Sequence, residues 1–534
     1  MKRKSYLLIM TLAIIFMLGL QTAAAQQWEI RLDTDRKQSC YECLPIDNGE
    51  NMLGVGLSAS PDPNAKKDRN GWIMKVFQDG SFIYKETHLP DMELVYCCAT
   101  QLANGNYMVF GVCDDSINTS VYDRYLCVDI FDEQLELVQH QIYCEEDDTF
   151  NGFYMAAVSE CEVMKCKLDN DGTVVLIFAV YYEEHYGPNS MSYRSRFRFN
   201  RLNENGDVVD SKDQPEEFEG DVQEGNEIVK ILKVPNSDNY LFFGTGSPYD
   251  HVIYGCIGLW HLSHDFTITS REHLNSFGGI HTPLYVATDG RWFDDNYFYI
   301  TTARNHDYDD SYQSIYKVDS SMHIYNQLDL PPKPNDTASY GVTGTSHAYL
   351  NDSTIFVVSM TSTYFSIGRW RDAYIALVDK DLNLLGRKTM HEDDLCLTPC
   401  QPVPLNNGSC LVPLVEYTGT LYNGESHKIM RVLCFNRDDF KITWDMVNED
   451  INEDIMPFPN PTSNVINIPV GDITLDNSRI QIFDIQGVKY LDCSIGEIGN
   501  LITIDTQNLE AGTYIYQVVS DDRILTKGKF VKEP

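Results

Sequence analysis

Short apolar runs rich in Val, Ile, Tyr and Phe, separated by turns rich in Asn, Asp and Gly, occupy most of this chain. The runs have the length of β-strands, and no long stretch shows the period of an amphipathic helix. The turns recur at long intervals: those that end at Gly49, Gly105 and Gly172 stand 56 and 67 residues apart. The pattern therefore predicts an all-β chain built from a repeated unit.

Each repeated unit contains four predicted strands. The recurring turn joins the first strand to the second, a third strand follows, as at Arg124 to Ile130, and a polar turn leads to a fourth, as at Ser81 to Lys85. Four antiparallel strands in each stretch of about 60 residues are typical of a β-propeller blade. One blade cannot bury both of its faces, so neighbouring blades must stack and the ring must close.

Seven such units fit between about Gln27 and Asn452, which predicts a seven-bladed β-propeller. Six or eight blades stay compatible with the pattern if one unit has been split or merged, whereas tandem β-sandwiches would need repeats of about 100 residues. The closure of the ring has two solutions. Trp28 to Leu32 could complete the last blade, or the last blade could use its own fourth strand at Phe440 to Met446.

The first 25 residues have the features of a secretory signal peptide. A positive start at residues 2–4 precedes an apolar stretch from Tyr6 to Leu20, and residues 23–25 supply an alanine cleavage site. No later apolar run is long enough to cross a membrane. We therefore expect an exported chain without a transmembrane segment.

Length and charge narrow the choice further. The chain has 534 residues and a formal net charge of −37 at pH 7. So acidic a protein repels phosphate backbones, which argues against nucleic-acid binding. The chain is too long for one ordinary core, and its composition changes after the acidic stretch Asn448 to Asp454. We predict a signal peptide at residues 1–25, the propeller at 26–452, and a linker with a small β-sandwich at 453–534.

Four short motifs occur in order in the tail. They are an aromatic-Pro-Asn-Pro opening, an Ile-x-Ile-x-Asp-x-x-Gly strand and turn, a Leu-x-x-Gly-x-Tyr segment and a final Lys-Phe-x-Lys strand. Their residues are Pro459, Asn460, Pro461, Asp484, Gly487, Leu509, Gly512, Tyr514, Lys529, Phe530 and Lys532. Together they resemble the type A C-terminal sorting domain of proteins that Bacteroidota export by type IX secretion. The resemblance implies recognition by the type IX machinery, followed by release or attachment to the outer cell surface.

Fifteen cysteines are present, all after the leader. Many lie at or just before predicted first strands, which line the centre of a propeller: Cys40, Cys43, Cys97, Cys98, Cys161, Cys166, Cys396 and Cys400. In an exported protein, disulfides or buried thiols are favoured over zinc. We expect Cys40 or Cys43 to pair with Cys396 or Cys400, which would tie the first blade to the last.

The sequence shows no catalytic signature, because Gly-x-Ser-x-Gly, His-Glu-x-x-His and the sialidase Asp box are all missing. Asp169 to Gly172 resembles the start of a calcium loop, but its later ligands are missing and the other units have a tight turn here. Four histidines between His261 and His281 are too irregularly spaced for a metal site. No cofactor or metal site is identified, although calcium stays compatible with the acidic loops.

Three triplets of the form Asp-Ser/Thr-apolar are similar to the acceptor sequence of O-glycosylation in Bacteroidota. The hydroxyl residues are Ser116, Thr337 and Ser353. They are candidate glycosylation sites.

The long loops expected between second and third strands and between units carry acidic runs and tyrosines, whereas the other turns are short. Long loops on a rigid scaffold often carry function. The candidate binding residues are Glu183, Glu184, Tyr186, Asp307, Tyr308, Asp309, Asp310, Glu392 and Asp393. We predict that this acidic face binds an extracellular carbohydrate or cationic partner, unless the carboxylates only keep the protein soluble.

These observations favour an exported cell-surface or extracellular binding module. The alternatives are a secreted hydrolase or lyase acting on glycan or peptide, with its site on the loop face, and a purely structural surface protein. Whether the chain is an enzyme is left open by the sequence, with binding favoured because no catalytic motif is present.

Overall fold

The computed structural model separates the chain into two compact units, Met1–Lys441 and Ile442–Pro534, and each is described by itself. The described residues are 28–32, 34–62, 68–90, 92–114, 124–143, 153–155, 164–187, 190–213, 227–246, 256–274, 284–294, 296–306, 310–330, 346–351, 354–360, 373–390, 395–418, 427–440, 459–469, 478–484, 489–494, 501–520 and 523–533. The regular elements in these ranges are β-strands, with two short 3-10 helices, η1 (Asp47–Gly49) and η3 (Arg437–Phe440). The all-β prediction is confirmed.

The described strands of the larger unit form seven antiparallel sheets. The first contains β2 (Lys37–Ile46), β3 (Asn51–Ala59), β4 (Arg69–Val76) and β5 (Phe82–Thr87). The second contains β6 (Glu93–Gln101), β7 (Tyr107–Asp114), β8 (Arg124–Phe131) and β9 (Leu137–Tyr143). The third contains β10 (Phe153–Met155), β11 (Met164–Leu168), β12 (Val174–Gly187), β13 (Ser190–Leu202) and β14 (Val208–Asp213).

The remaining sheets of this unit follow the same order. The fourth contains β15 (Glu227–Lys233), β16 (Tyr240–Gly246), β17 (Cys256–Leu262) and β18 (Ile268–Leu274). The fifth contains β19 (Leu284–Trp292), β20 (Phe298–His306), β21 (Asp310–Val318) and β22 (Ile324–Leu330), and the sixth β23 (Ser346–Asn351), β24 (Thr354–Met360), β25 (Ala373–Asp379) and β26 (Leu384–Met390). The seventh contains β27 (Leu395–Pro399), β28 (Val403–Pro404), β29 (Ser409–Thr418), β30 (His427–Asn436) and β1 (Glu29–Leu32).

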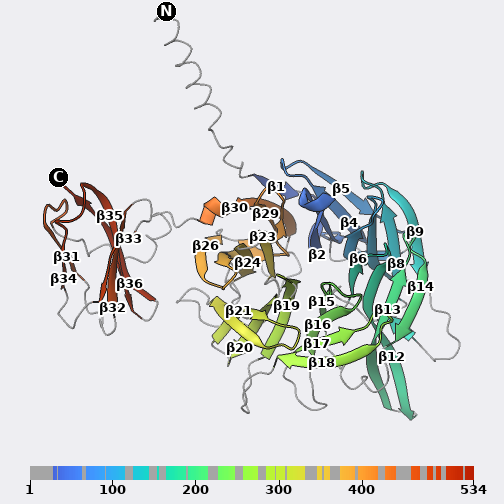
Figure 1. Ribbon diagram of the computed structural model, residues 1–534. Coiled ribbons are helices and arrows are strands. Elements are labelled where there is room, and N and C mark those ends of the chain that lie inside the picture. Colours follow the sequence, from blue (N-terminus) through green and yellow to red (C-terminus); the bar gives the residue numbers. More distant parts are fainter. Residues whose placement is uncertain are drawn as a thin grey trace, which may run out of the picture. The chain divides into compact units, whose positions relative to one another are not determined.

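The sheets succeed one another in chain order around a common centre (Figure 1). Each junction between neighbouring sheets has its own hydrophobic cluster, including the junction between the seventh sheet and the first. In that last cluster Trp72 and Met74 of β4 share a core with Val432 of β30. Both faces of every sheet are therefore covered by a neighbour, which is the physical requirement that the repeat predicts.

The seventh sheet takes its outer strand from the N-terminal end of the larger unit. β1 pairs with β30 along its whole length, with Glu29 opposite Leu433. Since β29 occupies the other edge of β30, a strand at residues 440–446 has no free edge of β30 to join. Of the two alternatives for the last sheet, the structure contains the pairing of β1 with β30. η3 ends at Phe440, and residues 441–446 lie outside the described residues.

A charge network holds β1 in this sheet. Glu416 on β29 is fully buried and lies 2.5 Å from Arg31 of β1 and 3.2 Å from Arg431 of β30. Arg431 also contacts Glu29 of β1 at 2.9 Å. Three adjacent strands thus share one buried carboxylate, so the attachment of β1 depends on electrostatics as well as on backbone pairing.

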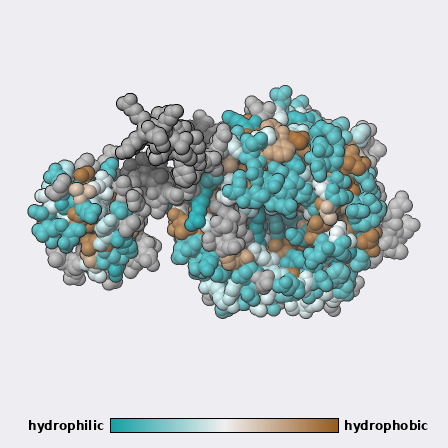
Figure 2. Space-filling view, turned by 45° about the horizontal axis from the view of Figure 1, so that its top comes forward, coloured by the Kyte–Doolittle hydropathy of each residue, from teal (hydrophilic) through white to brown (hydrophobic). Residues whose placement is uncertain are grey.

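The segment with Glu183, Glu184 and Tyr186, which we expected to be a loop, belongs to strand β12. β12 and β13 continue through it and stay paired, with Glu183 opposite Tyr193. Backbone groups of a long insertion need hydrogen-bond partners, and an extended hairpin supplies them. Figure 2 shows that the visible face of the larger unit is mostly hydrophilic, in keeping with apolar side chains packed between the sheets.

The smaller unit contains two sheets. One has the order β33-β32-β35-β36 and the other pairs β31 with β34. Their bounds are β31 (Val465–Pro469), β32 (Ser478–Asp484), β33 (Lys489–Ser494), β34 (Leu501–Asp505), β35 (Gly512–Ser520) and β36 (Arg523–Lys532). Isoleucines of both sheets pack with Tyr516 and Phe530 in one core. The unit is therefore a small β-sandwich, as the tail sequence predicted.

Candidate functional site

Four first strands carry a β-bulge at the same place in their sheets. The register shifts at Cys40/Glu42, Tyr96/Cys98, Ile228/Lys230 and Ala287/Asp289. The residue after each bulge pairs with one common position of the second strand, occupied by Val55, Phe110, Phe243 and Thr301. Bulges re-aim side chains and are frequent near functional sites. Glu42, Cys98, Lys230 and Asp289 are therefore structurally equivalent, and Lys165 of β11 has the same place opposite Ile177.

These equivalent side chains meet near the common centre of the sheets. Lys230 Nζ of the fourth sheet lies 3.8 Å from Glu42 Oε1 of the first and 3.9 Å from Asp289 Oδ1 of the fifth. It also lies 3.0 Å from the amide oxygen of Gln401 of the seventh sheet, in the amide orientation that lets Gln401 donate to the Cys43 carbonyl. One ammonium group of the fourth sheet thus contacts residues of the first, fifth and seventh sheets.

Both carboxylates of this group are held by the backbone. The fully buried Asp289 accepts the N–H of Gly290 at 2.8 Å, and Glu42 accepts the N–H of Ala99 at 3.0 Å, from the neighbouring sheet. Gly290 is required here because a β-carbon would stand 1.9 Å from the Phe243 ring. The orientation of the carboxylates is therefore fixed by the fold.

A second layer of cations lies two residues further along the first strands. Arg291 of β19 and Lys167 of β11 occupy equivalent positions, opposite Tyr299 and Val175. Arg291 contacts Asp289 at 3.4 Å and donates to the Pro402 carbonyl at 3.4 Å. Within the described ranges Lys167 has no ion-pair partner, and its side chain reaches solvent.

We call these residues the axial cluster: Glu42, Cys98, Lys165, Lys167, Lys230, Asp289, Arg291 and Gln401. Desolvation by the surrounding protein lowers the pKa of Lys230, although the charges of Asp289 and Glu42 oppose it. Desolvation likewise lowers the pKa of Lys167, and Arg291 adds to the effect. The described part of the cluster has four cations and two carboxylates, so it is locally positive in a strongly acidic protein.

The charged members of this cluster were not predicted from the sequence, although the cysteines of the first strands were placed at the centre. The signal was a lone charge inside an otherwise apolar first strand, as with Lys230 between Val229 and Ile231. The sequence pattern of one strand does not reveal a one-residue bulge. The equivalence of Glu42, Lys230 and Asp289, which depends on these bulges, could therefore not be predicted.

Several thiols surround the axial cluster. Cys40 Sγ lies 3.3 Å from Cys43 Sγ and within hydrogen-bonding range of Cys400. The bulge in β2 puts Cys40 and Cys43 on one face, since their partners Gly56 and Gly54 are two residues apart on β3. These three cysteines are free thiols in the structure, and the Cys396 side chain lies outside the described residues. The disulfide between the first and last sheets stays a prediction.

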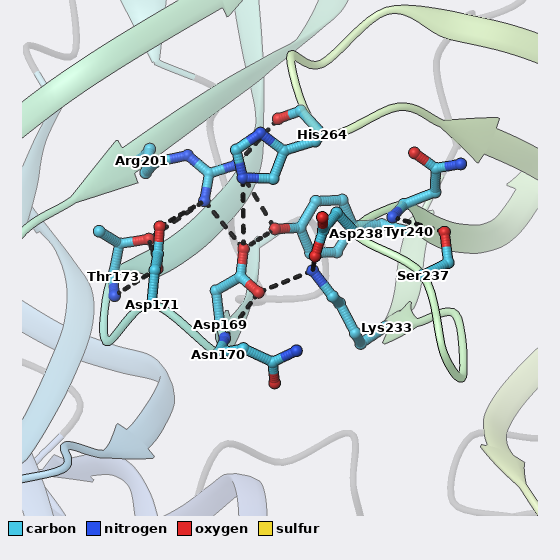
Figure 3. A network of polar contacts seen from close by, with 11 residues as sticks. Asp169, Asn170, Asp171, Thr173, Arg201, Lys233, Ser237, Asp238, Tyr240 and His264 are labelled. Carbon is cyan, nitrogen blue, oxygen red and sulfur yellow. Dashed lines mark hydrogen bonds and ion pairs between the residues drawn. The ribbon is translucent and has the colours of Figure 1, made fainter.

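A second polar network joins the third and fourth sheets (Figure 3). Asp169 accepts hydrogen bonds from Lys233 Nζ at 2.7 Å, from Arg201 Nη1 at 2.9 Å and from the Tyr240 hydroxyl. Gly172 N–H donates to the Asp169 carbonyl, so this segment is a tight turn, in agreement with the favoured interpretation. Because its oxygens already face two cations, Asp169 is a poor calcium ligand.

The same arrangement recurs between the first and second sheets. Asp47 lies 2.9 Å from Lys75 Nζ, which donates to the Tyr107 hydroxyl at 2.8 Å. Asp47 and Asp169 follow first strands, and Tyr107 and Tyr240 begin the second strands of the next sheets. The recurrence indicates that both networks hold neighbouring sheets together and are not ligand sites.

The predicted acidic face falls largely outside the described residues. Glu183, Glu184 and Tyr186 lie in β12 and Asp310 begins β21, but their side chains are not described; Asp307, Tyr308, Asp309, Glu392 and Asp393 lie outside the described ranges, as do Ser116, Thr337 and Ser353. The binding face and the glycosylation sites therefore stay predictions.

The tail motifs meet in space. Asp484 of β32 pairs with Tyr514 of β35, and Tyr514 pairs with Phe530 of β36, its ring stacked on that of Phe530 at 5.6 Å. The Pro-Asn-Pro opening lies along β36, since Asn460 Oδ1 accepts the N–H of Val531 at 2.9 Å. Leu509 packs against the core and Gly512 pairs with Lys532, whereas Gly487 lies outside the described residues. Motifs far apart in sequence thus form one structural unit.

Residues 457–533 match the family described as the secretion system C-terminal sorting domain. The tail is a type IX sorting domain. The protein is therefore exported and either secreted or attached to the cell surface, and its sorting domain implies recognition by the type IX machinery. In the described part of the chain, no helix is long and apolar enough to cross a membrane.

Solved structures resemble the chain only distantly, and no curated protein matches it. A protein of unknown function from Dyadobacter fermentans has 10% identity and a TM-score of 0.41, covering 76% of this chain and 97% of its own. The polysaccharide lyase Uly1 has 9% identity and a TM-score of 0.38, with 77% and 99% covered. The α-L-arabinofuranosidase Arb93A from Fusarium graminearum has 12% identity and a TM-score of 0.38, with 67% and 99% covered. At these values the likeness carries no argument about this chain.

Proposed function

We propose that this protein is an exported, closed seven-bladed β-propeller at residues 26–452 that binds an anionic extracellular ligand at the axial cluster, followed by the sorting domain at 453–534. The seven hydrophobic junctions support the closed ring. The ligand class is a carboxylated polysaccharide, whose acidic groups match the excess of cations in the cluster.

The observation that carries the proposal is the state of Lys167. Its ammonium group is unpaired within the described ranges, reaches solvent, and stands among further cations in a site that lowers its pKa. Lys167 would gain an ion-pair partner when an anion binds. The backbone hydrogen bonds to Glu42 and Asp289 keep the rest of the axial cluster in the same arrangement. Preorganised charges of this kind favour binding because little reorganisation is needed.

The test compares binding to polygalacturonate, neutral dextran and cationic chitosan by isothermal titration calorimetry. We expect polygalacturonate alone to bind, and Lys167→Gln to weaken it roughly 10–100-fold, as the loss of one charge-assisted contact of about 1.5–3 kcal/mol implies. The matched control is Lys85→Gln, which removes the same charge from the outer strand β5, where Lys85 contacts Glu136. Equal loss in both variants, or binding to dextran, would contradict the proposal, and binding to chitosan would favour the acidic face instead.

The affinity should also depend on pH. Only protonated Lys167 attracts an anion, and its pKa is lowered, so affinity should begin to fall at a lower pH than for an ordinary lysine with a pKa of about 10.4. In Lys167→Gln, the fall in affinity that accompanies deprotonation of Lys167 should be absent.

A secreted hydrolase or lyase is the second candidate. The observation in its favour is Lys230, because burial lowers its pKa although Asp289 and Glu42 oppose the shift, and a lysine with a lowered pKa is a candidate general base. The same polysaccharide incubations decide between the two functions. Catalysis would be shown if the wild-type protein released reducing ends or unsaturated products and Lys230→Met did not. Binding without product would support a binding module.

A further inference from the structure

The second sheet carries three metal-ligating groups on one face, away from the axial cluster. Cys127 and Asp129 are two residues apart on β8, and His140 of β9 stands directly opposite Asp129. Side chains with this spacing point to the same side of a sheet. Cys127 Sγ lies 3.8 Å from His140 Nδ1, Asp129 Oδ1 lies 2.5 Å from the same nitrogen, and all three ligand atoms are within 4.8 Å of one another.

The surroundings fix two of these groups and leave the third accessible. Cys127 and Asp129 are fully buried, and the Tyr96 hydroxyl donates to Asp129 Oδ2, which orients the carboxylate. The His140 side chain is 29% exposed. Hydrogen bonding to ligating carboxylates is typical of metal centres, and the exposed imidazole provides a path from solvent.

The described residues contain two other groups of possible metal ligands, and both have cations beside their carboxylates. In one, Lys230 lies 3.8 Å from Glu42; in the other, Arg201 and Lys233 contact Asp169. Asp129 has no lysine or arginine partner in the described ranges. Repulsion between a metal ion and a neighbouring cation disfavours the first two groups, whereas the group on β8 and β9 lacks this penalty.

We propose that Cys127, Asp129 and His140 bind one zinc ion, with solvent as the fourth ligand. One thiolate, one carboxylate and one imidazole form a donor set that suits this borderline-soft ion. Tetrahedral ligands at about 2.0–2.3 Å from zinc stand roughly 3.5 Å apart, close to the observed sulfur–nitrogen separation. The Asp129–His140 pair must open by under about 1 Å. The proton on Nδ1 moves to Nε2, and the thiol of Cys127 releases its proton to solvent.

Zinc binding must release protons from the ligands. The hydrogen bond that the Cys127 thiol donates to Cys113 raises the pKa of Cys127, burial raises it further, and zinc must displace this proton. Titratable groups that face the site are Cys113 of β7 and Tyr96 of β6, besides the three ligands.

The experiment measures metal content and spectra of the reduced, full-length mature protein after removal of bound metal. On titration with Zn²⁺, wild type should retain one equivalent more than Cys127→Ser and His140→Gln. Titration with Co²⁺ should give a thiolate charge-transfer band that both variants lack. Cys434→Ser, which removes a buried thiol of the seventh sheet, is the matched control and should behave as wild type.

Thermal unfolding supplies a second readout. Zinc that binds only the folded state raises the melting temperature, so wild type should gain stability with Zn²⁺ and His140→Gln should not. If Cys127→Ser fails to fold, the surface variant His140→Gln still decides the question. Equal zinc content and equal Co²⁺ spectra in wild type and His140→Gln would overturn the proposal.

Discussion

Replacing Asp169 with Asn tests whether the polar network of Figure 3 holds the third and fourth sheets together. The carboxylate is 3% exposed, and its partners Arg201 and Lys233 are 7% and 15% exposed. Removing its charge leaves Arg201 and Lys233 only with the exposed carboxylates of Asp171 at 3.8 Å and Asp238 at 3.7 Å among the ion pairs of Figure 3. Breaking a buried ion pair by removal of one partner costs about 3–5 kcal/mol, so we expect a loss of stability of this size.

The equivalent substitution between the first and second sheets, Asp47→Asn, should lower the free energy of unfolding by less than Asp169→Asn does. Asp47 is 24% exposed, and it has one cationic partner, Lys75, which keeps its hydrogen bond to Tyr107. The loss then corresponds to one charge-assisted hydrogen bond, about 1.5–3 kcal/mol. The structure thus predicts that Asp169→Asn destabilises the protein more than Asp47→Asn.

The destabilisation caused by Asp169→Asn should also disappear in acid. Burial by itself would raise the pKa of Asp169, but hydrogen bonds from Lys233, Tyr240 and Arg201 hold it well below its usual range. A depressed pKa stabilises the fold above the unfolded value of about 3.9, and the contribution is lost as pH falls towards the folded value. The difference between wild type and Asp169→Asn should therefore shrink below about pH 4.

The assay is denaturant unfolding followed by tryptophan fluorescence, with linear extrapolation to water. Residues 457–533 contain no tryptophan, so the signal does not report the sorting domain. A loss below about 1 kcal/mol for Asp169→Asn, or an equal loss for Asp47→Asn, would refute the argument from burial. A difference that persists unchanged into acid would refute the argument from charge.

Two further substitutions test the larger unit and the tail. Glu416→Gln should destabilise the protein by about 3 kcal/mol, because it removes the fully buried carboxylate that lies 3.2 Å from the buried Arg431. Arg31→Gln at the half-exposed end should cost under about 1 kcal/mol. Denaturant unfolding of both variants and of the double variant checks this. Deleting residues 456–534 should leave the larger unit folded but retained in the periplasm, and cell fractionation that finds normal export of the truncated chain would contradict this expectation.

The repeated unit could be predicted from the sequence because the short turns between first and second strands contain Asn, Asp and Gly in one unit after another. The third-to-fourth turns were harder to read. Gly80 and Gly206 have positive φ there, as a turn requires, but four other sheets put a buried apolar residue in the left-handed conformation: Leu135, Phe266, Met322 and Leu382. Left-handed backbone is unfavourable for such residues, and burial between neighbouring sheets offsets it. Local turn chemistry could not predict this choice.

The candidate site was less predictable than the fold. Sequence position alone put the cysteines at the centre, because first strands line the centre of any propeller. The bulges that align Glu42, Lys230 and Asp289 depend on pairing with the second strand, and the contact of Lys230 with Gln401 depends on sheets four and seven meeting. Such non-local geometry leaves no pattern in any single strand.

The net charge of −37 and a site for anions are compatible because the two act over different distances. At physiological ionic strength exposed charges are screened beyond about 8 Å, so the acidic surface exerts little force on a ligand already at the centre. Charges in the axial cluster are partly desolvated, as the lowered pKa values of Lys167 and Lys230 indicate, and are screened much less. In the proposed function the surface charge sets solubility, while the few central charges select the ligand. The acidic loops predicted a carbohydrate or cationic partner, whereas the excess of cations in the axial cluster is the basis on which we propose an anionic one.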